Sequence, residues 1–552
     1  MEPLLEQAQN WLNQDPDTET RQQLKTLIER AKENQTEAQN ELKQLFASRL
    51  QFGTAGLRGR LQAGCNGMNR VLVMQTAKGF ADYLLANHQQ PSIVIGYDGR
   101  KNSAIFAQDT AQIMAGAGIK TLLLPRPLPT PVLAFALRYF DCHAGVMVTA
   151  SHNPAHDNGY KVYLGKQHGG GQIVSPIDAH IAEAIDLAAQ ININDYPKSD
   201  DFTVLDETVI DAYVDATAKI ARAPKTELNF VYTALHGVGK DILLKTFQAA
   251  QLPLPHIVAE QAEPDAQFPT VVFPNPEEKG ALDLAFALAK QHNAELIIAN
   301  DPDADRFAVA LPDEQGNWHS IHGNLIGCYL AWYVAQQAKQ TGKQGALACS
   351  LVSTPALAKI AQHYDLTHEE TFTGFKYIAK VKNMIYGFEE SLGYLVDPEK
   401  VADKDGISAA VAFVDLVCQL KAAGKSLHDY IQSFTETFGA FDSTQISLRV
   451  KVLDDIAALM NAFRQTPPQA IGAQKITAYK DYLNHQEPHN ILVYHLNNGN
   501  RVIIRPSGTE PKVKVYLDVV GKDAQDAKRA LNVLENDMRE LLRQETYGKQ
   551  AV

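Results

Sequence analysis

The stretch SIVIGYDGRKNSAIFAQDTAQIMAGAGIKTLLL, residues 92–124, decides the fold class. Residues 92–96 form a short apolar run typical of a buried strand, residues 104–116 carry apolar side chains at helical spacing, and residues 121–124 are apolar again. Two parallel strands joined by a crossover helix make a βαβ unit. The stretch therefore predicts an α/β fold in which helices cover both faces of a largely parallel sheet.

The same alternation continues along most of the chain. Further strand-like runs, each followed by loop residues and a helical pattern, stand at 144–149, 230–233, 257–258, 295–299, 345–348 and 384–386. Two regions depart from this pattern. Residues 2–47 are polar and helix-like, which predicts a helical surface cap, whereas the C-terminal region has strand-like runs with few helices at 445–453, 491–496, 502–504 and 513–520.

The length of 552 residues suits three or four domains. Polar, turn-forming stretches near 195–201, 311–316 and 435–443 interrupt the apolar pattern. We therefore expect three related α/β domains and one smaller α+β domain. Their predicted bounds are 1–200, including the helical cap, 201–312, 313–436 and 437–552.

The composition excludes several classes of protein. With 45% hydrophobic and 21% charged residues, the chain lies in the globular range. A net charge of −12 without a dense Lys/Arg block argues against nucleic-acid binding. Five scattered cysteines without a C-x-x-C pair argue against disulfides and structural zinc. Because no apolar run reaches the roughly 18 residues of a membrane span and the N-terminus is acidic, we expect a cytoplasmic protein; the sequence indicates no oligomeric state.

The first chemical motif is Thr-Ala-Ser-His-Asn-Pro at 149–154, directly after the strand at 144–148. Ligands collect at the carboxyl ends of strands in open α/β sheets, so Ser151 and His152 stand where chemistry tends to occur. A serine hydroxyl becomes a nucleophile or phosphate carrier when neighbouring groups accept its proton and stabilise the negative charge that develops on its oxygen. An ordinary turn, which also favours Ser, Asn and Pro, is the alternative interpretation.

The second motif, Asn-Asp-Pro-Asp-Ala-Asp-Arg at 300–306, also follows an apolar strand. Asp301, Asp303 and Asp305 alternate, so an extended backbone would place the three carboxylates on one side. Two carboxylates about 4 Å apart repel by about 4 kcal/mol at an effective dielectric of about 20, which calls for a cation. Oxygen ligands favour Mg²⁺ over Zn²⁺. Arg306 stands where an EF-hand loop needs glycine, so that calcium site is excluded; three solvated aspartates in a turn are the alternative.

The third motif is Arg-Pro-Ser-Gly-Thr-Glu-Pro-Lys at 505–512, between two predicted strands. Its arginine fork, two hydroxyls, glycine and lysine are donors that a phosphate dianion accepts, which predicts a phosphate clamp. A β-hairpin loop with incidental charge is the alternative.

The fourth motif, Gly-Phe-Glu-Glu-Ser-Leu-Gly at 387–393, follows the predicted strand at 384–386. Two adjacent carboxylates and a hydroxyl here can accept hydrogen bonds from vicinal sugar hydroxyls, although a pair of glutamates is also common in the first turn of a helix. Arg58, in a glycine-rich stretch, and Lys161, ten residues after Ser151, are weaker candidates, since either can be a surface charge.

Together and in this order, the four motifs resemble the α-D-phosphohexomutase superfamily, the phosphoglucomutases and phosphomannomutases. The resemblance covers about residues 53–516. It implies four domains around a central cleft, with Ser151 as the phosphorylated serine. It further implies that Mg²⁺ is held by Asp301, Asp303 and Asp305 together with a phosphoryl oxygen on that serine.

The resemblance also implies roles for the remaining candidates. Glu389 and Ser391 would contact sugar hydroxyls, and Arg306 and Lys376 would help bind the substrate. Arg58 would act electrostatically, because an arginine is a poor base, and Lys161 or His152 would handle the proton. The phosphate that is not transferred would be gripped by Arg505, Ser507, Gly508 and Thr509.

The implied activity interconverts hexose 1-phosphate and hexose 6-phosphate through the phosphoserine and a sugar bisphosphate. We expect glucose phosphate first and mannose phosphate second. Phe388 and the segment 403–406 resemble a branch that includes phosphopentomutases, which ranks ribose or deoxyribose phosphate third. A metal-dependent sugar-phosphate phosphatase and a non-catalytic sugar-phosphate sensor are the alternatives from other functional classes.

Overall fold

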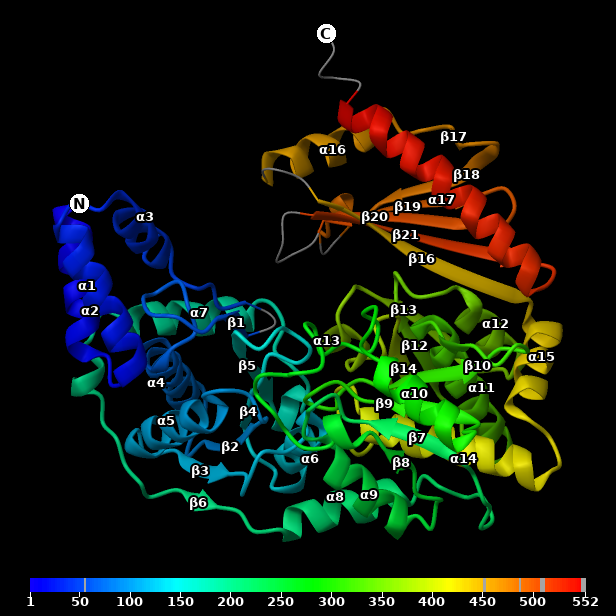
Figure 1. The fold of residues 1–552 in the computed structure, drawn as a ribbon, viewed down its shortest axis with the longest axis horizontal. Helices are drawn as coiled ribbons and strands as arrows, with labels where there is room; N and C mark the ends of the chain where they lie inside the picture. The colour runs from blue at the N-terminus through cyan, green and yellow to red at the C-terminus, as the bar shows by residue number, and fades with distance from the viewer. Residues whose placement is uncertain (54–55, 450–452, 486–487, 507–511, 548–552) are drawn as a thin grey trace. The chain divides into compact units, whose positions relative to one another are not determined.

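The computed structural model describes residues 1–53, 56–449, 453–485, 488–506 and 512–547 (Figure 1). The chain divides into two compact units. The first unit comprises residues 1–321, 374–388 and 392–422, and the second comprises residues 322–373, 389–391 and 423–552.

The first unit contains most of the alternating strands and helices. Its helices are α1 (Glu2–Gln14), α2 (Thr18–Lys32), α3 (Thr36–Leu45), α4 (Arg70–Asn87), α5 (Ser103–Gly116), α6 (Thr130–Tyr139), α7 (Ile177–Ala188), α8 (Thr208–Ala218), α9 (Gly239–Ala249), α10 (Asp283–His292), α13 (Phe375–Ile378) and α14 (Gly406–Ala422). Its strands are β1 (Leu57–Arg60), β2 (Ser92–Tyr97), β3 (Lys120–Leu123), β4 (Ala144–Val148), β5 (Asp157–Leu164), β6 (Thr203–Val204), β7 (Phe230–Thr233), β8 (His256–Ile257), β9 (Leu296–Ala299), β10 (Ala308–Pro312), β11 (Trp318–Ser320), most of β14 (Met384–Glu389) and β15 (Gly393–Leu395).

The helices α1 to α3 form the predicted N-terminal cap. Asp17 starts α2 by accepting hydrogen bonds from the backbone N–H groups of Glu19 and Thr20. The apolar faces of these helices are buried in the same hydrophobic cluster as α4, α5 and β2. The prediction of a helical cap is therefore confirmed, and burial of its apolar face holds the cap on the unit.

The first sheet has the order β1-β5-β4-β2-β3-β6. Strands β4, β2, β3 and β6 are parallel, and β5 and β1 continue the sheet in antiparallel pairing. Ile93 and Ile95 of β2 pack in a cluster with α4 and α5, whereas a side chain at Gly96, on the opposite face, would meet Leu133 of α6. Helices thus cover both faces, as predicted for residues 92–124.

The second sheet has the order β11-β10-β9-β7-β8. Strands β9, β7 and β8 are parallel, and β10 and β11 are antiparallel additions. The four residues of β9 are all buried because α10 and neighbouring strands cover them. The segment that carries the three aspartates begins directly after β9, at the carboxyl end of a parallel strand.

The second unit contains an antiparallel sheet and a smaller parallel strand pair. Its helices are α11 (Gly323–Thr341), α12 (Ala356–His363), α15 (Leu427–Phe438), α16 (Leu453–Gln465) and α17 (Ala524–Tyr547). Its strands are β12 (Ala346–Ser350), β13 (Thr367–Thr371), β16 (Ala440–Arg449), β17 (Ala470–Ile471), β18 (Gln474–Asp481), β19 (Leu492–Leu496), β20 (Arg501–Pro506) and β21 (Lys512–Gly521).

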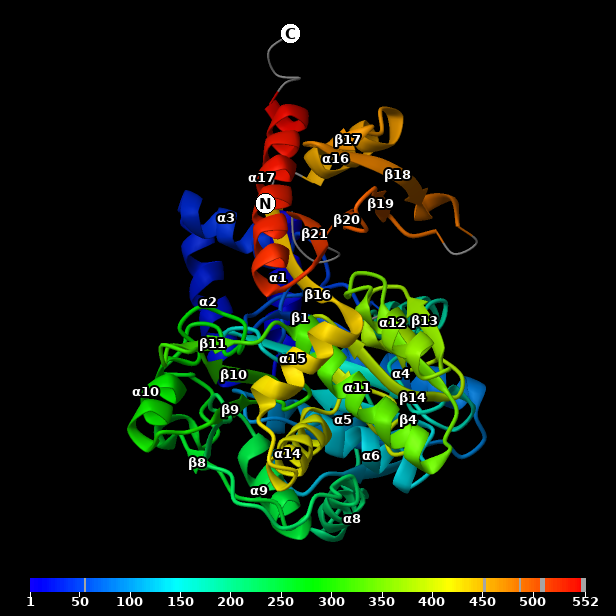
Figure 2. The same ribbon diagram turned by 90° about the vertical axis from the view of Figure 1, so that its right-hand side faces the viewer.

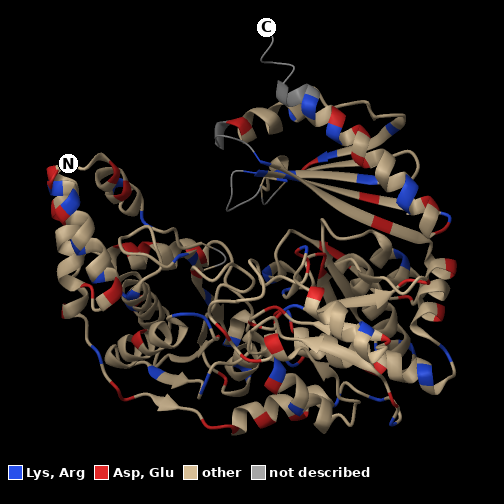
Figure 3. Cartoon of the chain, in the orientation of Figure 1, with Lys and Arg blue, Asp and Glu red and all other residues tan. Residues whose placement is uncertain are grey.

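The antiparallel sheet has the order β16-β21-β20-β19-β18-β17, and β12 and β13 pair in parallel. Helix α17 contacts β16 and β21, and both views show it beside these strands (Figures 1 and 2). This arrangement confirms the predicted α+β character of the C-terminal part. Positive and negative side chains alternate along α17, so this helix carries no continuous basic face (Figure 3).

Among the described residues, no single helix is both long enough and apolar enough to cross a membrane. One bent pair, α14 with α15, meets that test of length and composition. Residues 406–418 of α14 are buried within the protein.

Candidate active site

Ser151 lies in a tight turn after β4, with a positive φ of 52°. Its side chain is buried, and Oγ donates a hydrogen bond to Oδ2 of Asp301 at 2.9 Å. The same Oγ lies 3.2 Å from Nδ1 of His152. A hydroxyl that follows a strand of the first sheet therefore meets a carboxylate that follows a strand of the second sheet, 150 residues later in the chain.

A buried arginine holds the turn that carries Ser151. Arg100 follows β2, and its guanidinium donates to the backbone oxygens of Ser151 and Asn153, both at 2.6 Å. Asp98 lies 3.3 Å from Nε of Arg100 and accepts a hydrogen bond from Thr149 Oγ1 at 2.7 Å. Neither Arg100 nor Asp98 was predicted from the sequence. Their position directly after a parallel strand, like that of Ser151, was the available signal.

Asp301, Asp303 and Asp305 converge as predicted but through a different backbone. All three are fully buried, and one carboxylate oxygen from each lies within 4.8 Å of the others. The segment is a turn with Ala304 at a φ of 53°, not an extended strand. The backbone N–H of Gly406 donates to Ala304 O at 3.2 Å and so helps to hold this turn.

The aspartate cluster has unpaired anionic oxygens. Lys161 Nζ donates to Oδ2 of Asp303 at 2.7 Å and to Oδ2 of Asp305 at 2.8 Å. Oδ1 of each of these two aspartates is buried and has no hydrogen-bond partner among the described residues. An unpaired buried anionic oxygen is costly, so the donor set fits a cation. The three carboxylates supply only oxygen and can hold a divalent metal ion.

The acidities of the cluster are shifted in opposite directions. Burial raises the pKa of Asp301 well above its ordinary value, and Asp303 and Asp305 raise it further. Burial also acts to raise the pKa of Asp305, but Lys161 and Lys404 outweigh it and hold that pKa below its ordinary value. Such divergent shifts in one buried cluster are typical of functional sites.

Lys404 is a further residue of the site that was not predicted from the sequence. Its Nζ lies 3.2 Å from Oδ2 of Asp305.

Lys161 is held as a cation. Burial acts to lower its pKa, but Asp303 and Asp305 raise it above the ordinary lysine value. Its ammonium therefore balances part of the negative charge of the aspartates.

Three more predicted residues lie around this cluster. Arg58 Nη1 donates to Oδ1 of Asn153 at 3.3 Å, in the turn of Ser151. Arg306 Nε lies 3.9 Å from Oδ2 of Asp301. Burial, followed by the charges of Arg306 and Arg58, lowers the pKa of His152 well below its ordinary value, so its ring is neutral at pH 7.

Lys376 lies on the short helix α13, and its Nζ is 5.2 Å from the centre of the Tyr377 ring. Burial lowers its pKa to about 8, although Asp178 acts to raise it. In the described residues, no hydrogen bond or ion pair joins Lys376 to the serine and aspartate cluster.

Of the predicted sugar-binding segment, residues 389–391 belong to the second unit. Ser391 Oγ donates to Oε1 of Glu390 at 3.3 Å, and Ser350 Oγ donates to Oε2 of the same glutamate at 3.1 Å. The backbone N–H of Glu390 donates to Ser353 Oγ at 3.1 Å. Glu389 and Ser391 are both partly buried. Glu390 is the second carboxylate of the motif, and the family resemblance gave it no role of its own.

Of the predicted phosphate clamp, Arg505 lies at the end of β20 and is partly buried. Ser507, Gly508 and Thr509 lie outside the described residues.

Four family models match consecutive parts of the chain. They are described as phosphoglucomutase/phosphomannomutase alpha/beta/alpha domain I at residues 49–191, domain II at 211–316, domain III at 322–438, and the C-terminal domain at 449–535.

Individual proteins are also similar to the chain. A probable phosphomannomutase from Haemophilus influenzae is 61% identical over 484 residues, which cover 88% of the chain and 99% of that protein. A human phosphopentomutase is 32% identical and covers 97% of the chain and 95% of its own length. Among solved structures, a phosphoglucomutase/phosphomannomutase family protein from Burkholderia thailandensis has a TM-score of 0.71 and 18% identity, covering 91% of the chain and 98% of its own.

Proposed function

Because the chain belongs to the phosphoglucomutase/phosphomannomutase family, we propose that it is the mutase that converts hexose 1-phosphate into hexose 6-phosphate and back. Glucose phosphate is the first substrate and mannose phosphate the second. The reaction runs through a phosphoserine at Ser151 and a sugar bisphosphate. The observation that carries the proposal is the 2.9 Å hydrogen bond from Ser151 Oγ to Asp301, within a buried cluster of three aspartates.

Mg²⁺ is the proposed ion of the aspartate cluster. Asp301, Asp303 and Asp305 would hold it, and the unpaired Oδ1 atoms of the last two support this assignment. When bound, the ion supplies positive charge where negative charge develops on the transferred phosphoryl group.

The phosphoryl group moves between Ser151 Oγ and a sugar hydroxyl. The bond from phosphorus to the serine oxygen breaks while the bond to the sugar oxygen forms, and the sugar hydroxyl gives up its proton. The reverse transfer returns the other phosphate of the bisphosphate to the serine. Arg100 keeps the carbonyl of residue 151 fixed through both transfers.

Two residues are candidates for accepting the proton that the sugar hydroxyl gives up. The ring of His152 is neutral, with Nδ1 3.2 Å from the serine oxygen. Lys161 is held protonated by two aspartates, which supports a charge-stabilising role for it. We therefore favour His152 as the group that accepts the proton and assign Lys161, Arg58 and Arg306 to the stabilisation of negative charge.

Substrate binding is proposed for residues elsewhere in the chain. Glu389 and Ser391 would bind sugar hydroxyls, and Lys376 would bind a phosphate oxygen. The non-transferred phosphate would be held by Arg505, Ser507, Gly508 and Thr509. We further propose a cytoplasmic location, which the five free, buried cysteines support.

A pentose phosphate is the third candidate substrate, after the two hexose phosphates. Human phosphopentomutase matches 97% of the chain, which is a larger share than the relative from Haemophilus influenzae covers. Initial rates on glucose 1-phosphate, mannose 1-phosphate and ribose 1-phosphate, measured side by side, distinguish these candidates. A rate on ribose 1-phosphate well above both hexose rates would overturn the hexose assignment.

The central test is Ser151→Ala. The variant loses the phosphate-carrying oxygen, so isomer formation should fall by at least about 10⁴-fold, the scale of losing a covalent nucleophile. Circular dichroism checks that the variant is folded. Release of inorganic phosphate is measured in the same assays, because release without isomer formation by the unaltered protein would favour a phosphatase. Full activity of Ser151→Ala would contradict both the mutase and its phosphoserine.

A further inference from the structure

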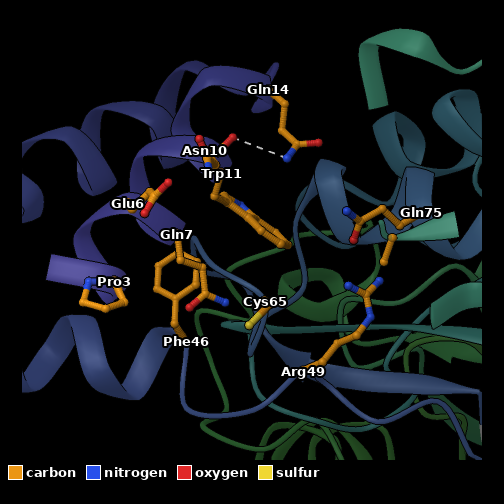
Figure 4. Close-up of a pocket in the computed structure, with 11 residues that line it drawn as sticks. Pro3, Glu6, Gln7, Asn10, Trp11, Gln14, Phe46, Arg49, Cys65 and Gln75 are labelled. Atoms are coloured by element: carbon orange, nitrogen blue, oxygen red, sulfur yellow. Dashed lines mark hydrogen bonds between the residues drawn. The ribbon is translucent and has the colours of Figure 1, made fainter. Parts of the chain in front are cut away.

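A pocket of about 540 Å³ lies in the first unit, beside the N-terminal helices (Figure 4). Its buried lining includes Trp11 of α1, Phe46 directly after α3, and Gln75 of α4. Its exposed rim includes Glu6 and Asn10. The volume lies within the range of about 300–1,000 Å³ found for small-molecule sites. None of the residues that line it belongs to the serine and aspartate cluster.

Three of the residues that line this pocket each have a buried polar atom without a hydrogen-bond partner among the described residues: Trp11 Nε1, Arg49 Nη2 and Gln75 Oε1. Trp11 is 7% exposed and Gln75 is 2% exposed. Figure 4 shows the amide of Gln75 and the guanidinium of Arg49 on one side of the pocket, with the indole ring of Trp11 extending toward them. Two donors and one acceptor thus belong to residues in the wall of a single pocket.

Gln75 is a polar residue at a buried position of α4, where apolar residues are usual. Its neighbours in α4, Leu72, Val73 and Met74, are buried apolar residues of the main cluster. A buried amide oxygen without a partner costs about 1–3 kcal/mol, a cost that an apolar residue of similar size avoids. A polar side chain in this place is therefore explained better by a ligand than by stability.

The lining indicates the charge of the ligand. Glu6 and Arg49 are its only charged residues, so their formal charges cancel, and the other polar side chains are Gln7, Asn10, Gln14 and Gln75, all neutral amides. Asp186 lies 3.9 Å from Nε of Arg49 and reduces its attraction for anions further. The pocket therefore suits an uncharged ligand better than a phosphate or a carboxylate.

The three unpaired atoms indicate the polar groups of the ligand. Trp11 Nε1 and Arg49 Nη2 only donate and Gln75 Oε1 only accepts, whereas a hydroxyl group does both. The rings of Trp11 and Phe46 meet edge to face, with centres 6.0 Å apart, and offer apolar surface for C–H groups. We propose that this pocket binds a neutral saccharide, a ring that combines several hydroxyls with an apolar face.

The test uses maltose as the probe and the full-length protein. Isothermal calorimetry and tryptophan fluorescence should show saturable binding. Trp11→Phe keeps an aromatic ring but removes Nε1–H, and Gln75→Leu removes the acceptor, so each should weaken binding about tenfold, the loss of one hydrogen bond. Trp318→Phe, on β11 outside the pocket, is the matched control and should bind maltose unchanged.

Further measurements separate this site from the active site and from a purely structural role. Ser151→Ala should bind maltose as the unaltered protein does, because Ser151 does not line the pocket. Without sugar, Gln75→Leu should have an unchanged or higher melting temperature, since it removes an unpaired acceptor.

The proposal is overturned if maltose shows no saturable binding, or if Trp11→Phe and Gln75→Leu bind it unchanged. Loss of binding in Ser151→Ala would place the sugar in the active site instead. Tighter binding of phenylacetate than of maltose would show that the pocket prefers an anion.

Discussion

Three features fix the conformation of Ser151: its positive φ, the hydrogen bonds from Arg100 to its turn, and the hydrogen bond from its hydroxyl to Asp301. Its φ of 52° is uncommon for a residue with a side chain, and this conformation persists only where the surroundings enforce it. Arg100 supplies that enforcement through its two 2.6 Å hydrogen bonds to backbone oxygens of the turn. The turn directs the hydroxyl to Asp301, so a local cost in backbone energy orients the oxygen that we propose to carry the phosphoryl group.

Lys376 provides a prediction about pH. Its pKa is about 8 in the folded protein, against an ordinary value of 10.5, because burial disfavours its charged form. If Lys376 binds substrate phosphate as a cation, kcat/KM should fall as the pH rises through about 8. Lys376→Arg stays charged at that pH and should lose this alkaline decline. Steady-state rates from pH 7 to 9.5 measure both profiles, and an identical decline in the two proteins would argue against the role.

The same shift predicts a change in stability. Between about pH 8 and 10.5 the unfolded chain still binds the proton that folded Lys376 has released, so the free energy of unfolding should rise with pH. The penalty for burying the charge is complete below pH 8. Urea unfolding of Lys376→Met at pH 7 and pH 10 should show a smaller rise than the unaltered protein shows.

At the scale of elements, the aspartate turn is held from two sides. It follows β9, and the first residue of α14, Gly406, packs against its backbone. An added Cβ at Gly406 would lie 2.2 Å from Arg306 O and 2.7 Å from Ala304 O. The absence of a side chain at Gly406 thus allows the start of α14 to pack closely against the aspartate turn. The position of α14 therefore affects the positions of the Asp301, Asp303 and Asp305 carboxylates.

Gly406→Ala should therefore displace the aspartate turn. We expect kcat to fall at least about tenfold and the free energy of unfolding to fall by about 2–3 kcal/mol, because the clash involves backbone that cannot rotate away. Gly145→Ala in β4 is the matched control. Its Cβ would meet its nearest neighbour at 3.6 Å, an ordinary contact, so its effect should stay below about 1 kcal/mol. Equal losses in the two variants would contradict the proposed link.

At the scale of the whole molecule, each unit has apolar cores of its own. The first contains the large cluster that joins α1 to α5 with the first sheet, and the second contains the cluster between α17 and the antiparallel sheet. None of the aspartate ligands belongs to these clusters. Lys161 and Lys404 already balance part of the aspartate charge, so we expect the protein to fold without a metal ion.

Chelation should consequently stop turnover while the protein stays folded. EDTA should abolish isomer formation, and added Mg²⁺ should restore it. The melting temperature should fall by only a few degrees, because loss of a bound ligand removes its binding free energy and about 1 kcal/mol corresponds to roughly 2–4 °C. Differential scanning calorimetry with and without EDTA measures the shift. Global unfolding in EDTA would mean that the metal is structural.

Much of the fold could be predicted because its signals are local. The βαβ stretch at 92–124 and the strand before Ser151 carry their periodicity in a few consecutive residues, and the structure confirms them. The aspartate turn shows the limit of this reasoning, since alternation predicted an extended backbone and the structure has a turn at Ala304. The three predicted boundaries between the four domains remain a prediction.

Local sequence patterns were sufficient to predict the fold class and the family resemblance and to single out Ser151 and the three aspartates as candidates, because short apolar runs and compact motifs carry these signals. Only the tertiary structure brought Ser151 within hydrogen-bond distance of Asp301 and recruited Arg100 and Lys404. Within the described part of the chain, it also left Trp11 Nε1 and Gln75 Oε1, of two residues that line one pocket, without a hydrogen-bond partner. Such contacts join residues far apart in the chain, and their geometry depends on the packing of whole sheets and helices, which no local pattern encodes.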